Sequence, residues 1–63
     1  MAVSAVDISR SLSGIDFPAN KEDLVNHARE KKANKEVINI LQQMPDQEYG
    51  NMADVEHAFG QVK

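Results

Sequence analysis

The sequence predicts an all-α fold, a compact bundle of four short helices packed around the third helix. Three observations lead to this prediction. Polar residues that can cap helices recur along the chain, apolar residues recur at helical spacing, and no segment alternates apolar and polar residues as a half-buried strand would. The 63 residues suffice for a single small helical domain, 1–63. The expected helices span residues 5–13, 21–32, 35–44 and 52–60.

The most apolar stretch of the chain is residues 36–44, with the sequence EVINILQQM. At 100° per residue, one line along this predicted helix passes through Val37, Leu41 and Met44, and an isoleucine flanks the line on each side. That apolar arc is wide, so we expect other segments to cover this helix on more than one side. Leu41 lies at the centre of the arc and is expected to be among the most buried residues.

Each predicted helix follows a short polar side chain whose oxygen can accept hydrogen bonds from the free amides of the first turn. In three cases an aspartate three residues later can return a hydrogen bond, which gives a capping box. The pairs are Ser4 with Asp7, Asn20 with Asp23, and Asn51 with Asp54, and Asn34 is the cap of the third helix. At the other ends, Gly14 can adopt positive φ, Pro45 stops the third helix, and Gly60 weakens the last one.

Two connectors of the chain have one aromatic residue each. Phe17 is expected to anchor the first connector in the core, and Tyr49 to fix the second. Pro18 disfavours helical backbone at Phe17, so the first connector should be extended. The two connectors also resemble each other, since both lead into an Asn cap with an Asp three residues later. General capping chemistry explains most of this likeness, and a true duplication remains the alternative.

Composition excludes several classes of protein. The chain has no cysteine, so it can form neither a disulfide nor a thiolate metal site. The N-terminus lacks the pattern of a signal peptide, and no apolar segment approaches the length of a membrane span. We therefore expect a soluble cytoplasmic protein with no membrane association.

Catalytic and metal-binding patterns are also missing from the sequence. The two histidines, His27 and His57, have no further ligands at metal-binding spacing, and we expect His27 at the edge of a buried stripe and His57 in solvent. The carboxylate pairs sit at helix starts and turns, and no phosphate loop or nucleophile motif is present. A bundle this small has little room for a cleft. The sequence predicts no enzyme, no metal and no cofactor.

The charges are unevenly distributed along a chain of net charge −3. Residues 29–35, REKKANK, hold four cations against Glu30 alone, whereas the C-terminal part is acidic. The candidate interaction residues are Arg29, Lys31, Lys32 and Lys35, and the acidic residues are Asp46, Glu48, Asp54 and Glu56.

A family resemblance extends over about residues 9–58. It rests on the runs 14–19 (GIDFPA), 23–25 (DLV), 27–30 (HARE), 44–46 (MPD) and 53–55 (ADV), together with Lys21, Glu36, Val37, Leu41, Glu48 and Tyr49. These residues resemble a family of small bacterial domains catalogued as domain of unknown function 2795. The resemblance implies a compact helical bacterial domain and supplies no activity or ligand residues.

The sequence departs from that family pattern at Lys32, where a glycine is common, at Gln47, where a basic residue is common, and at Met52, where a proline is common. A non-glycine residue with positive φ costs about 1 kcal/mol. Lys32 should therefore disfavour a left-handed end for the second helix.

By elimination, the sequence favours a small protein-interaction or regulatory module whose partner is another protein or a second copy, through its acidic half. The alternative is a nucleic-acid-binding protein that uses the basic residues 29–35. Helices two and three could suggest a helix-turn-helix, but a recognition helix must present a polar face to DNA, and helix three is the most apolar element. Net acidity also disfavours binding to phosphates.

Overall fold

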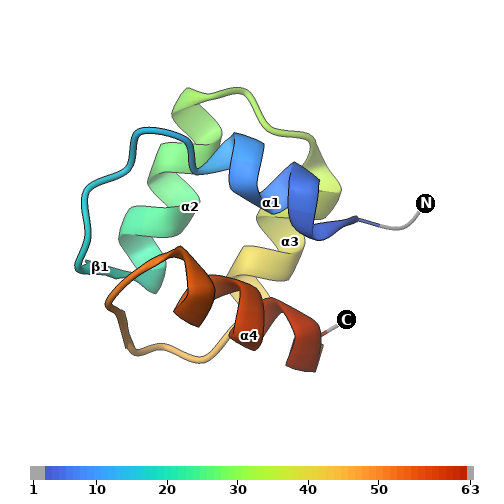
Figure 1. Cartoon of the computed structure of the whole chain (residues 1–63). Coiled ribbons are helices and arrows are strands. Elements are labelled where there is room, and N and C mark those ends of the chain that lie inside the picture. The colour runs from blue at the N-terminus through green and yellow to red at the C-terminus, as the bar shows by residue number, and fades with distance from the viewer. Residues whose placement is uncertain (1–2, 63) are drawn as a thin grey trace.

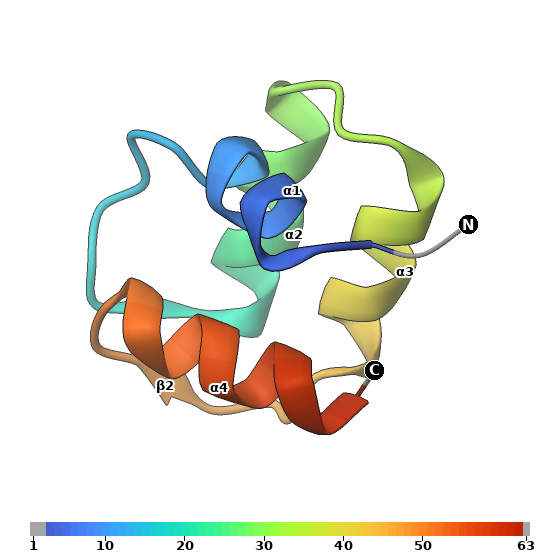
Figure 2. The same cartoon turned by 45° about the vertical axis from the view of Figure 1, so that its right-hand side comes forward.

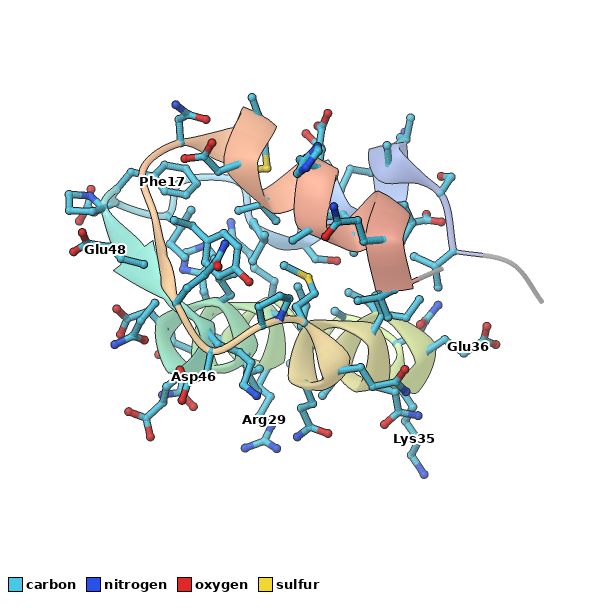
Figure 3. All side chains as sticks on the ribbon, turned by 90° about the horizontal axis from the view of Figure 1, so that it is seen from below. Phe17, Arg29, Lys35, Glu36, Asp46 and Glu48 are labelled. Atoms are coloured by element: carbon cyan, nitrogen blue, oxygen red, sulfur yellow. The ribbon has the colours of Figure 1, made fainter. Side chains whose placement is uncertain are left out.

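Four helices form two layers in the computed structural model, which describes residues 3–62 (Figure 1, Figure 2). The helices are α1 (Ala5–Ser11), α2 (Lys21–Glu30), α3 (Lys35–Gln43) and α4 (Met52–Val62). Figure 3 shows α1 and α4 in one layer and α2 and α3 in the other. Helix α3 contacts each of the other three helices, and its contact with α2 is the most extensive. The all-α fold packed around the third helix is therefore confirmed.

All four predicted N-caps form, including that of α4, where the Asp54 amide donates to Oδ1 of Asn51 at 3.0 Å. The amide of Asp23 donates to Oδ1 of Asn20 at 2.8 Å, and Asp23 returns the bond to the Asn20 amide at 3.2 Å. Ser4 and Asp7 form the same capping box before α1. Asn34 accepts a bond from the amide of Val37 at 3.1 Å. These bonds join residues three apart in the sequence, so short local patterns are enough to predict them. The capping box predicted for α4 differs from the prediction, because the Asp54 carboxylate accepts from the Gly50 amide instead of the Asn51 amide.

The C-terminal ends of the helices differ from those predicted from the sequence. Gly14 has φ 84, as its predicted role requires, but α1 already ends at Ser11 rather than residue 13. Helices α2 and α3 end at Glu30 and Gln43, short of the expected residues 32 and 44. Helix α4 instead continues past Gly60 to Val62, because Val62 packs against the core and offsets the weak helix propensity of glycine.

The two connectors pair as a very short antiparallel sheet that the sequence did not predict. Strand β1 (Ala19–Asn20) aligns Ala19 with Tyr49 of strand β2 (Glu48–Tyr49). Strands of two residues are too short to show the alternation by which strands are recognised in a sequence. The Phe17–Pro18 peptide bond in the first connector is cis. The two connectors with similar sequences therefore lie side by side, and each leads directly into a helix.

The core is mainly aliphatic and includes two buried aromatic side chains, Tyr49 and Phe59. Leu41 has no exposed surface, as predicted. Tyr49 is the largest fully buried side chain, and its hydroxyl donates to the carbonyl oxygen of Pro45 at 2.6 Å. Phe17 is only partly buried against the core, so its predicted anchoring role is confirmed only in part. The other fully buried large side chains are Ile8, Leu12, Leu24, Met44 and Val55.

Replacing Leu41 tests this description of the core. Leu41→Ala should lower the free energy of unfolding by about 2–5 kcal/mol, because it leaves a cavity where α3 contacts its neighbours. Gln43→Ala on the exposed side of the same helix is the matched control and should change it by less than about 0.5 kcal/mol. Urea denaturation followed by circular dichroism measures both. Equal stability of the two variants would show that the core is misplaced.

Candidate interaction surface at the α2–α3 corner

A tight turn joins α2 to α3. Helix α2 ends with Lys31 as C-cap, and the amides of Lys32 and Ala33 donate to the carbonyl oxygens of Arg29 and Ala28, both at 3.0 Å. These two bonds define a Schellman motif, in which the residue after the C-cap has positive φ. Asn34 then immediately caps α3, so the chain reverses direction within a few residues.

Lys32 is the residue with positive φ, at 59°. The expectation that a lysine would disfavour a left-handed helix end is therefore wrong for this structure. The Schellman hydrogen bonds and the packing of Ala33 against the core hold the turn in place. A left-handed lysine still costs about 1 kcal/mol relative to glycine.

The turn gathers the four predicted interaction residues at one corner, which we call the cationic corner. All four side chains are exposed, and within residues 3–62 none of them has a hydrogen-bonding or ion-pairing partner. Arg29 and Lys35 project to the same side of the α2–α3 layer, whereas Glu36 points away from that side (Figure 3). The corner consists of Arg29, Lys31, Lys32 and Lys35.

Next to this corner, the surface of the α2–α3 layer has a hollow of about 550 Å³, which we call the outer hollow. The Nζ atom of Lys21 donates to the carbonyl oxygen of Gln42 at 3.1 Å and so joins α2 to the end of α3. The sequence predicted little room for a cleft, and this hollow corrects that expectation. Its lining comes from separate parts of the chain, so no local motif could indicate it. The lining residues are Asn20, Lys21, Glu22, Val25, Asn26, Arg29, Gln42 and Asp46.

A second hollow, of about 460 Å³, lies on another side of α2 and includes His27. The Nε2 atom of His27 lies 2.8 Å from the carbonyl oxygen of Ser13. A carbonyl oxygen only accepts, so Nε2 has the proton in this contact. His27 is half-buried at the edge of the α2 stripe and His57 is exposed, both as predicted. The contact indicates a structural role for His27, since it joins α2 to the turn after α1.

The acidic residues of the C-terminal part are exposed, but they do not gather into one surface as the cations of the cationic corner do. Asp54 accepts a hydrogen bond from the Gly50 amide at 3.0 Å and so serves the start of α4. Asp46 lines the outer hollow together with Arg29, whereas Glu48 lies toward Phe17 (Figure 3). Burial raises the pKa of Tyr49 above its ordinary value of 10.0, and the negative charge of Asp46 raises it further.

These features define a small helical domain with capped helices, a two-residue strand pair and polar surface hollows. Residues 3–56 match the family model described as "Protein of unknown function (DUF2795)", and the chain belongs to that family. No curated protein and no solved structure matches the chain. None of the helices within residues 3–62 has the length and apolar character needed to cross a membrane. The match shows which family the chain belongs to, and the description of that family names no activity.

Glycine substitutions at the two neighbouring lysines of the turn, Lys32 and Lys31, should change stability in opposite directions. Lys32→Gly should raise the free energy of unfolding by up to about 1 kcal/mol, because glycine adopts positive φ without steric cost. Lys31→Gly removes the same charge from a residue with φ −81 and should lower stability by about 0.5–1 kcal/mol. Thermal unfolding of both variants measures this difference. The same sign of change for both would contradict the turn geometry.

Proposed function

We propose that this domain is a small non-enzymatic module of the bacterial cytoplasm that docks on an acidic surface of another protein through the cationic corner. The observation that supports the proposal is the gathering of four exposed cations, without partners among residues 3–62, at one turn of a chain with net charge −3. A surface of one sign steers an oppositely charged partner and orients it.

Such a contact is weak unless other groups reinforce it. Each exposed ion pair contributes about 0–1 kcal/mol, and salt screens it with a Debye length of about 8 Å at physiological ionic strength. We therefore expect a transient, salt-sensitive association, which suits a regulatory module better than a permanent subunit.

Two arguments favour a different protein over a second copy as the partner. The cationic corner and the acidic residues are different surfaces, so self-association through them would be head-to-tail and would extend into chains unless it closed a ring. Within residues 3–62 the one large apolar side chain that is mainly exposed is Val6, so no apolar patch supports a symmetric dimer.

Binding to nucleic acid is the second candidate. Lys35, Asn39 and Gln42 are exposed at helical spacing on α3, so this helix does have a polar outer face. That observation removes one argument made from the sequence against a recognition helix. However, α2 and α3 run antiparallel beside each other rather than crossing as in a helix-turn-helix (Figure 1, Figure 2). Asp46 and the net charge of −3 also disfavour phosphate binding, so this candidate stays second.

Affinity capture from nuclease-treated native lysate tests the proposal. The immobilised domain should retain a protein partner at low salt and release it at high salt. A variant with all four corner residues changed to Gln should lose that partner, while Arg10→Gln, which removes one exposed cation from α1, should retain it. Equal capture by the wild type and the four-residue variant would contradict the assignment of the corner. A partner captured from untreated lysate but not from nuclease-treated lysate would favour nucleic acid instead.

A further inference from the structure

The outer hollow adjoins the cationic corner and shares Arg29 with it. Glu22, Asn26 and Arg29 recur at i, i+4 and i+7, so they line one side of α2 over about 10 Å of helix axis. Val25 supplies the apolar floor, because it lines the hollow and is only 7% exposed. The hydrogen bond from Lys21 to the Gln42 carbonyl oxygen holds the facing end of α3 against α2.

The side chains of the hollow suit a peptide with a carboxylate. The Arg29 guanidinium is exposed, has no partner among residues 3–62, and presents fixed parallel donors that match a carboxylate. Asn26 and Gln42 are exposed amides, each with the donor and the acceptor that one peptide group requires. Glu22 and Asp46 also line the hollow and would repel a second carboxylate.

We propose that the outer hollow binds an extended segment of the partner protein, with one acidic side chain on Arg29 and main-chain groups on Asn26 and Gln42. This inference rests on the proposed function and deepens it, since it names the anchoring residue and the kind of segment recognised. An extended chain rises about 3.3 Å per residue, so the line of α2 residues matches about three residues of the partner. The site selects an isolated acid among neutral residues rather than a continuous acidic run.

Titration of the isotope-labelled domain with short blocked peptides, followed by nuclear magnetic resonance, tests this site. The first peptide is a pentapeptide with one central Glu among Gly and Ser, the second has Gln instead of Glu, and the third is pentaglutamate. The first peptide should shift the side-chain amide signals of Asn26 and Gln42 and bind at least as tightly as pentaglutamate. The Gln peptide should bind about fivefold more weakly, as expected for one exposed ion pair.

Single-residue variants distinguish binding in the outer hollow from attraction by charge alone. Arg29→Gln should weaken binding of the first peptide about fivefold, whereas Arg10→Gln, the matched removal of one arginine charge on α1, should leave the dissociation constant unchanged. Lys31→Gln removes a charge from the corner outside the hollow and should have a smaller effect than Arg29→Gln.

Three results would overturn the hollow as the site and leave the proposed function intact. Equal weakening by Arg29→Gln and Lys31→Gln, or tighter binding of pentaglutamate than of the first peptide, would indicate attraction by charge alone. The third result is the absence of signal shifts at Asn26 and Gln42 with every peptide. The lysate capture with the four-residue variant decides the proposed function separately.

Discussion

Tyr49 holds together parts of the fold that are far apart in the sequence. Its side chain is fully buried, its hydroxyl bonds to the Pro45 carbonyl oxygen, and its backbone aligns with Ala19 of the other connector. Strand β1 leads directly into α2, and strand β2 is followed within a few residues by α4, so this contact fixes where one helix of each layer begins. The second connector is otherwise exposed from Pro45 to Glu48, which leaves Tyr49 as its attachment to the core.

The position of the cationic corner follows from this arrangement. Helix α2 starts at a place fixed by the strand pair and ends in the Schellman turn, and α3 returns beside it with Lys21 bonded to Gln42. The corner and the outer hollow are thus the end and the outer side of one antiparallel helix pair. Lys32 adds a positive charge in a backbone conformation that glycine would adopt at lower cost, which is consistent with a functional use of charge at this turn.

The sequence predicts those features that depend on nearby residues. The four caps join residues three apart, the stripe of α3 follows from helical spacing, and the cationic corner is already a run of basic residues. Features decided by distant contacts could not be predicted in the same way. The two-residue strands are too short to show an alternation of apolar and polar residues. Helix α4 continues past Gly60 because Val62 packs against the core. Lys32 adopts positive φ because the turn forms hydrogen bonds to the preceding helix. The outer hollow draws its lining from α2, α3 and the segment after α3, so only the folded chain reveals it.

An alkaline titration tests the central role of Tyr49 most directly, because Tyr49 is the one tyrosine of the chain and its phenolate absorbs distinctly in the ultraviolet. Its pKa is raised in the folded state, so its contribution to stability is complete below the ordinary value of 10.0 and is lost as pH rises through the folded value. We predict that phenolate absorbance and the loss of helical circular dichroism develop together as pH rises through the pKa of Tyr49 in the folded state. The stability of Tyr49→Phe should change less over the same range. Ionisation of Tyr49 with an unchanged helical signal would contradict the account.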